Sequence, residues 1–261
     1  MTALNAVTRV LYGQKRWKKI TSMLFAEHDN IMPIGVSEFP KAIMSMAVGF
    51  LPIDGKLMPV ALQALVTGQN WYVTQDGKWQ DSYVPAIYGC YPFRLVKSER
   101  DELVLCIDEA SGLVVDEASD EGELFFAEEN NPSPAISQIL NNLNKIEQDK
   151  AKSQAICSLL QSYDLFEPWP IELKGEQGNQ LIEGLYRINE KQLHALPAEA
   201  LLELRNNNAL LIIYGQLFSM HNLQKLGRLA SIYNNARKTP QTPEINFGVL
   251  EDSGSISFDN L

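Results

Sequence analysis

Residues 31–126 carry short apolar runs that Pro or Gly interrupts every several positions. These runs are rich in Val, Ile, Tyr and Trp, residue types that favour extended backbone. We therefore expect short β-strands rather than helices in the N-terminal half of the chain.

Residues 70–82 give the strongest single β signal. The sequences NWYVTQ and KWQDSY flank Asp76-Gly77, a dipeptide that accepts the two positive φ angles of a type I′ turn. A two-residue loop there places Gln75 opposite Lys78 and Thr74 opposite Trp79. The pattern predicts a β-hairpin with aromatic side chains on both faces.

Further strands are expected at residues 83–88, 92–97, 102–107 and 112–115, which would extend the hairpin into an antiparallel meander. Residues 116–129 are rich in Asp and Glu and contain no basic residue. This acidic segment is expected to be a solvated loop, from which Leu124-Phe125-Phe126 returns to the core.

The hydrophobic period changes after Pro132. Ser133 can cap a helix that begins with Pro134, and apolar residues then recur at three- and four-residue spacing. This pattern predicts one long helix, or two helices with a break near Asp149, to about Tyr163. The sequence EPWP at residues 167–170 would end it. A strand at 181–188 and helices at 197–205 and 216–235 are expected next, whereas residues 210–214 fit a buried strand or a helix start equally well.

These elements predict an α+β protein in which an antiparallel sheet from the N-terminal half is packed by helices from the C-terminal half. We expect a single domain over residues 1–236 and a C-terminal docking tail over residues 237–261. In this tail Ile256 and Phe258 alternate with polar residues, which suits a strand added to a sheet edge of the same chain or of a second copy. A homodimer is the expected assembly.

The formal net charge of −10 would repel phosphate backbones, so nucleic acid is not an expected partner. A local exception is the basic run Lys15, Arg16, Lys18 and Lys19, which either contacts an anion or forms a solvated face. No apolar run reaches the ~18 residues of a transmembrane helix, and the first residues do not resemble a classical signal peptide. We expect a cytoplasmic protein, or one that reaches the cell surface by another route.

Catalytic signatures are absent from the sequence. His28, His194 and His221 lack the spacing of metal ligands, and Cys90, Cys106 and Cys157 form no CxxC pair. Cys90, between aromatic residues, is the one cysteine considered as a nucleophile, although this setting is more typical of a core residue. No metal or cofactor is expected.

Aromatic residues give the best candidate for function, because Trp and Tyr combine a large contact area with a polar group and dominate recognition surfaces. They either form a groove for a peptide or glycan or simply fill the core of the sheet. Glu38 and Arg94, each beside an aromatic-proline pair, would be the polar anchors of such a groove. The candidate ligand-binding residues are Glu38, Trp71, Tyr72, Trp79, Tyr83, Tyr91 and Arg94, and Tyr88 and Phe93 belong to the same aromatic set.

Several short sequence blocks occur in an order that resembles the bacterial SapC family. They are EFP at 38–40, MPVAL at 58–62, GQN at 68–70, DGKW at 76–79, YVPA at 83–86, YPF at 91–93 and GLYRINE at 184–190. The resemblance covers roughly residues 38–222. It implies a link to a crystalline bacterial surface layer or to envelope export, and it implies no established catalytic residues.

Two classes of function therefore compete. The first is a non-catalytic accessory or binding protein of the bacterial envelope, which fits the aromatic set and the missing catalytic motifs. The second is an enzyme that acts on a peptide or sugar through residues distant in the sequence. Converging carboxylates or an activated cysteine in a pocket would favour the enzyme.

Overall fold

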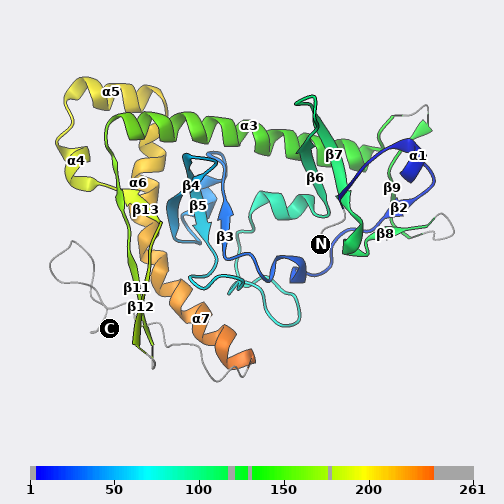
Figure 1. The fold of residues 1–261 in the computed structure, drawn as a ribbon, viewed down its shortest axis with the longest axis horizontal. Helices are drawn as coiled ribbons and strands as arrows, with labels where there is room; N and C mark the ends of the chain where they lie inside the picture. The colour runs from blue at the N-terminus through cyan, green and yellow to red at the C-terminus, as the bar shows by residue number, and fades with distance from the viewer. Residues whose placement is uncertain (1–3, 117–120, 129–130, 176–177, 238–261) are drawn as a thin grey trace. The chain divides into compact units, whose positions relative to one another are not determined.

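The computed structural model of the chain describes residues 4–116, 121–128, 131–175 and 178–237. These residues form two compact units, whose elements are shown in Figure 1. The first unit takes its residues from Met1–Phe25 and Ala86–Gln148, and the second from Ala26–Pro85 and Asp149–Leu261. The single domain expected over residues 1–236 stays a prediction, and the tail from residue 238 onward lies outside the described residues.

The first unit contains two antiparallel sheets. One has the strand order β1 (Leu4–Ala6), β7 (Leu103–Asp108) and β6 (Phe93–Lys97), and the other has β8 (Val114–Val115), β2 (Arg16–Trp17) and β9 (Glu123–Leu124). The strands expected at 92–97 and 102–107 are therefore confirmed. Short helices along this part of the chain are α1 (Arg9–Tyr12), η1 (Leu24–Ala26), η2 (Ala86–Cys90) and η3 (Glu109–Ser111).

The basic run near the N-terminus meets the acidic segment within the first unit. Lys18 forms an ion pair with Glu121, and Lys19 lies 3.4 Å from Glu123. The Arg16 guanidinium donates to the carbonyl of Gly122 at 3.1 Å. The chain therefore supplies counter-charges for its own basic run. Of the residues expected to return to the core, Phe125 is fully buried, whereas Leu124 is exposed.

The second unit is built on a five-stranded antiparallel sheet. Its strand order is β10 (Phe166–Pro168), β13 (Tyr186–Ile188), β4 (Val48–Ile53), β5 (Lys56–Leu62) and β3 (Ile31–Pro33). A separate hairpin consists of β11 (Ile171–Gly175) and β12 (Gly178–Ile182). The strand expected at 181–188 is interrupted, because Gly184 adopts a φ of 91° between β12 and β13. The antiparallel α+β fold is confirmed, with β10 and β13 added to the sheet from the C-terminal half.

The type I′ hairpin forms at Asp54-Gly55 instead of at Asp76-Gly77. Both residues of the first dipeptide have positive φ, 51° and 76°, and join β4 to β5 with Ile53 opposite Lys56. At the second dipeptide only Gly77 has positive φ, because the loop includes one more residue: the Thr74 amide donates to the Lys78 carbonyl at 2.9 Å. Val73 therefore faces Trp79 in a single bridge, and the expected register, with Thr74 opposite Trp79, is wrong.

The strand expected at residues 83–88 is also wrong. Tyr83 and Pro85 are buried and alternate with exposed neighbours, which imitates a strand in the sequence. Their backbone cannot complete a ladder, since Pro85 has no N–H and the Tyr83 carbonyl accepts a hydrogen bond from the Trp79 indole at 2.7 Å. Helix η2 follows directly.

The long helix α3 (Pro134–Ser162) begins as predicted, with the Ser133 hydroxyl accepting a hydrogen bond from the Ile136 amide at 3.2 Å. Its residues to Gln148 belong to the first unit. The second unit also contains α2 (Phe39–Ala42), α4 (Glu190–His194), α5 (Ala198–Asn206), α6 (Ala209–Ser219), η5 (Met220–Asn222) and α7 (Leu223–Arg237). Residues 210–214, left open between strand and helix, lie in α6.

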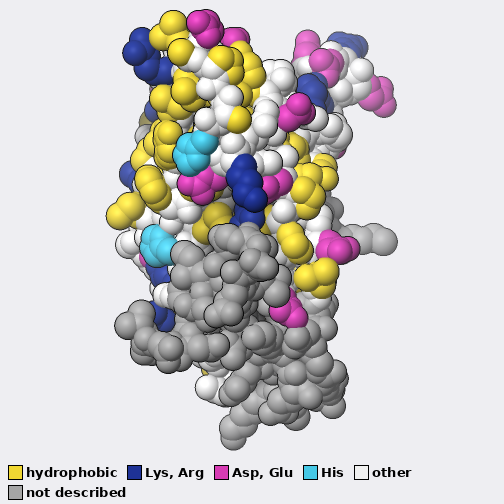
Figure 2. Space-filling view, turned by 90° about the vertical axis from the view of Figure 1, so that its left-hand side faces the viewer, with side chains coloured by type: hydrophobic (Ala, Val, Ile, Leu, Met, Phe, Trp, Pro, Cys, Tyr) yellow, Lys and Arg dark blue, Asp and Glu magenta, His cyan; other side chains and the backbone are white. Residues whose placement is uncertain are grey.

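Exposed apolar side chains occur on these helices. Leu201 and Leu202 of α5 and Phe218 of α6 are exposed, and Figure 2, which views the side carrying α4 and α5, shows hydrophobic side chains gathered in its upper part.

Within the described residues, no helix is both long enough and apolar enough to cross a membrane. The expected homodimer stays a prediction.

A buried glutamine of α6 completes the central sheet. Strands β13 and β4 form only the pair Tyr186↔Phe50. Two residues further on, the Gln216 amide bridges the strands: its Oε1 accepts from the Ile188 amide at 3.0 Å and its Nε2 donates to the Val48 carbonyl at 3.2 Å. Gln216 is fully buried, so no water replaces these bonds.

Replacing Gln216 with leucine should strongly destabilise the protein. Gln216→Leu introduces an apolar side chain of similar size. It leaves the Ile188 N–H without its partner and the Val48 C=O with only the 3.4 Å contact from the Ser219 hydroxyl, at about 1–3 kcal/mol for each lost bond. We expect the free energy of unfolding in urea to fall by about 2–5 kcal/mol. Gln161→Leu, an exposed change on α3, should stay within about 0.5 kcal/mol. Equal losses in the two variants would contradict this role of Gln216.

Candidate binding site

The residues predicted to bind a ligand divide between the two units. Glu38, Trp71, Tyr72, Trp79 and Tyr83 belong to the second unit, whereas Tyr91 and Arg94 belong to the first. Each group has its own surroundings, so a single groove that joins Glu38 to Arg94 stays a prediction.

The residues of the second unit form a connected cluster. The Tyr83 hydroxyl donates to Oε2 of Glu38 at 2.7 Å, and the Trp79 indole donates to the Tyr83 carbonyl at 2.7 Å. The Trp79 ring stacks on Tyr72 with a centroid distance of 5.3 Å. Burial, together with the negative charge of Glu38 and its hydrogen bond, raises the pKa of Tyr83 far above its usual range.

Two members of this cluster are core residues. Trp71 and Tyr72 are fully buried, and their polar atoms donate to the Gln69 side chain at 2.8 Å and to the Ser45 carbonyl at 3.2 Å. Burial, followed by the charge of Asp81, raises the pKa of Tyr72. Trp79 and Glu38 are half-buried, so they are the members of the cluster that a ligand could contact without rearrangement of the core.

The aromatic residues of the first unit form a separate group. Tyr91 stacks on Phe25 at a centroid distance of 3.9 Å, and Tyr88 meets the same ring edge-on at 5.5 Å. Phe93 is buried against Trp17, and Arg94 is exposed on β6.

Cys90 is buried, as are Cys106 and Cys157. Burial raises the pKa of the Cys157 thiol to about 12, which keeps it protonated near neutral pH.

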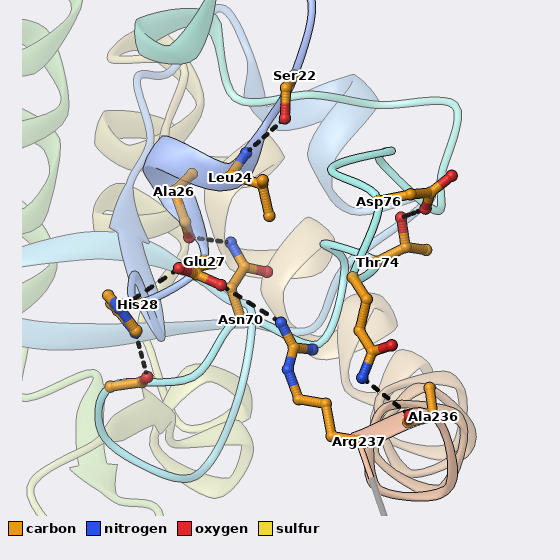
Figure 3. A network of polar contacts seen from close by, with 12 residues as sticks. Ser22, Leu24, Ala26, Glu27, His28, Asn70, Thr74, Asp76, Ala236 and Arg237 are labelled. Carbon is orange, nitrogen blue, oxygen red and sulfur yellow. Dashed lines mark hydrogen bonds and ion pairs between the residues drawn. The ribbon is translucent and has the colours of Figure 1, made fainter. Parts of the chain in front are cut away.

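A polar network fixes the segment that leads to Trp71. The Asn70 amide donates to the Ala26 carbonyl at 2.9 Å, and its Oδ1 accepts from the Tyr72 amide at 3.0 Å. Figure 3 shows Arg237, at the end of α7, reaching Glu27 in the same network, with a separation of 3.4 Å. The adjacent His28 ring contacts the Gly68 carbonyl at 2.9 Å. The Gln75 side chain donates to the Ala236 carbonyl at 2.8 Å, so residues 68–76 are anchored both to residues 26–28 and to α7.

A pocket of about 390 Å³ lies beside this anchored segment. No sequence motif predicts it, because most of its lining residues are ordinary aliphatic residues from distant parts of the chain. The lining residues are Asn30, Ile31, Leu51, Leu62, Ala64, Leu65, Val66, Thr67, Ile182, Glu183 and Leu185.

One face of the central sheet forms the floor of this pocket. Ile31 pairs with Leu62, and Leu51 pairs with Met58, four residues before Leu62 on β5. Paired residues share a face and side chains alternate along a strand, so Ile31, Leu51 and Leu62 point to the same side. Ile182, the last residue of β12, also lines the pocket, together with Glu183 and Leu185.

The edge strand of the same sheet borders the pocket. At the two ends of β3, the Asn30 carbonyl accepts from the Gln63 amide at 2.8 Å and the Ile34 amide donates to the Pro59 carbonyl at 3.0 Å. Because bonded residues alternate along an antiparallel pair, the backbone groups of Ile31 and Pro33 point away from β5. Among the described residues, no strand pairs with β3 on that side.

Ionisable side chains do not converge on this pocket. Glu183 is the one charged side chain among its described lining residues. Across the part of the chain that the structure describes, no group of three or more His, Cys, Asp or Glu is arranged to hold a metal ion. The geometry of the pocket is therefore that of an apolar binding site with a polar rim formed by Asn30, Thr67 and Glu183.

Comparison with known proteins identifies one family. The family model described as SapC matches residues 7–226, which is more than half of the chain, and the chain belongs to the SapC family. No curated protein and no solved structure matches.

Tyr83→Phe tests the Glu38–Tyr83 contact. The variant loses a buried hydrogen bond to a carboxylate, so near pH 7 its free energy of unfolding should be lower by about 1–3 kcal/mol. The raised pKa of folded Tyr83 means that this tyrosine favours the folded state below its usual pKa of about 10 and loses that contribution as the pH rises through it. The stability difference between wild type and variant should therefore narrow between about pH 9 and pH 11.

Urea unfolding at several pH values measures this difference, with Tyr214→Phe as the control. The Tyr214 side chain is exposed on α6 and stacks on Phe218, a contact that phenylalanine retains. A difference for Tyr83→Phe that stays constant across the pH range would show that the hydroxyl is not in the described environment.

Proposed function

We propose that this member of the SapC family is a binding protein that takes an extended peptide segment along β3 and places one aliphatic side chain in the adjacent pocket. Its proposed role is that of an accessory protein for the bacterial surface layer or for envelope export. The observation that carries the proposal is the combination of an edge strand, unpaired among the described residues, with an apolar pocket on the same sheet.

The edge of β3 supports a peptide as the ligand. Outward N–H and C=O groups of an edge strand pair with another extended backbone, whatever its sequence. Pro33 donates no hydrogen bond, so the outward groups that remain are both groups of Ile31 and the carbonyl of Pro33. Such a short edge pairs with only a few residues, which favours a reversible contact.

The pocket would supply the selectivity that backbone pairing lacks. A strand added beside β3 places one residue next to Ile31, and a side chain on the same face points toward Leu62 and the pocket. The volume of about 390 Å³ lies at the lower end of the range for ligand pockets. This space suits one aliphatic side chain together with its neighbouring backbone.

The role in the envelope is supported by family membership, since the resemblance to SapC implies a link to the surface layer or to export. Surface-layer and exported proteins are polypeptides, which is the ligand chemistry that an edge strand recognises. Half-buried Trp79 and its neighbour Glu38 remain the proposed second point of contact with the ligand, taken from the candidate ligand-binding residues. The roles proposed for Trp71, Tyr72, Tyr83, Tyr91 and Arg94 stay predictions.

Filling the pocket should weaken peptide binding. Val66 lines the pocket, whereas Val36 packs against the same core and is not among the lining residues; both are half-buried. We expect Val66→Trp to weaken binding of fluorescein-labelled, capped hexapeptides that carry a central leucine by at least about tenfold. The pocket contact that Val66→Trp removes contributes roughly 1–3 kcal/mol to binding. Val36→Trp leaves this contact in place and should keep the affinity within about twofold.

Fluorescence anisotropy measures these affinities, and circular dichroism checks the folding of both variants. Hexapeptides with alanine in place of leucine and a panel of labelled oligosaccharides complete the set. Equal loss of binding in the two variants, or binding of oligosaccharides in place of peptides, would overturn the proposal.

A further inference from the structure

We infer that the ligand of the β3 pocket carries a positive charge two residues from its aliphatic side chain, and that Glu183 selects for it. This inference rests on the proposed peptide-binding function. It names the chemical class of the ligand: a segment with an aliphatic residue and a lysine or arginine on the same face of an extended backbone.

The backbone around Glu183 places it at the rim of the pocket. Ile182 ends β12 half-buried, and Leu185 is buried in the core of the second unit. Between them, the left-handed φ of 91° at Gly184 turns the chain, and open space surrounds the position of a Cβ there. Glu183 is exposed on this turn and lines the pocket beside these two apolar residues.

The charge of the rim has a single sign. Glu183 is the one charged side chain among the described lining residues, and the remaining polar ones are Asn30 and Thr67. An ionised carboxylate only accepts hydrogen bonds, so it favours an ammonium or guanidinium group and repels another carboxylate. The formal net charge of −10 adds a long-range field of the same sign.

The proposed spacing is the shortest that keeps both ligand side chains on one face of an extended chain. Side chains two residues apart lie on one face of an extended chain, about 6.5–7 Å apart. Asn30, Ile31 and Thr67 place the pocket at the N-terminal end of β3. A ligand residue beyond that end follows the aliphatic residue if the added strand is antiparallel to β3, and precedes it if the strand is parallel. The order Leu-x-Lys therefore indicates antiparallel addition, and Lys-x-Leu indicates parallel addition.

Capped hexapeptides that differ at one position test the inference on the intact 261-residue chain. One pair contains Leu-Thr-Lys and Leu-Thr-Glu, a second pair contains Lys-Thr-Leu and Glu-Thr-Leu, and glutamine peptides serve as neutral references. In the wild type we expect the better lysine peptide to bind about fivefold more tightly than its glutamine reference, with the glutamate peptide weaker than both. The preference should shrink as salt increases from about 0.05 to 0.5 M.

Glu183→Gln should remove most of this preference and Glu183→Lys should reverse it. The control is Glu199→Lys, which makes the same charge change at an exposed position in the first turn of α5 and should leave the preference within about twofold. Equal affinity for the lysine, glutamine and glutamate peptides would overturn this inference alone, as would a lysine preference that survives Glu183→Lys. Failure of every peptide to bind the wild type would overturn the proposed function as well.

Discussion

The central sheet of the second unit depends on one side-chain amide. Strands β13 and β4 make one backbone pair, Tyr186↔Phe50, and then separate. Gln216 enters at the next bonding position, where its amide offers the acceptor and the donor that a strand would otherwise provide to Ile188 and Val48. A buried amide satisfies both groups only in this orientation, so α6 has a fixed position and rotation relative to the sheet.

That fixed sheet determines what its other face can hold. At Gly49 on β4, a Cβ atom would lie 3.2 Å from the Trp169 ring, so this indole packs directly against the strand backbone. Beyond this contact the same face continues to Leu51, Leu62 and Ile31, which form the floor of the pocket. The pocket therefore lies where the tight cover near Trp169 ends and the edge strand begins. Its shape follows from the ends of secondary-structure elements more than from any single side chain.

The two Asp-Gly dipeptides show how far local sequence reasoning reaches. Both can form a type I′ turn, and only Asp54-Gly55 does. At Asp76-Gly77, the Thr74 hydroxyl accepts from the Lys78 amide at 2.8 Å and donates to Asp76 at 2.5 Å, which stabilises the longer loop. Helix α3 was predictable because its period and its Ser133 cap are local. The choice between two equivalent turns depends on neighbouring side chains and on the pairing of β4 with β5, which the dipeptide does not encode.

The candidate site also has a part that the sequence indicated and a part that it did not. Aromatic residues have a strong chemical signature in a sequence, yet Trp71 and Tyr72 are fully buried and their polar atoms bond inside the protein. The pocket is built mostly from Ile, Leu, Val and Ala, which are typical of any core. The one charged side chain among its described lining residues, Glu183, directly precedes Gly184. A sequence pattern shows which side chains favour burial, because hydrophobicity is a property of the side chain. It does not show which part of a sheet is left uncovered by helices or loops, since that depends on elements distant in the chain. The candidate pocket lies where this cover is incomplete.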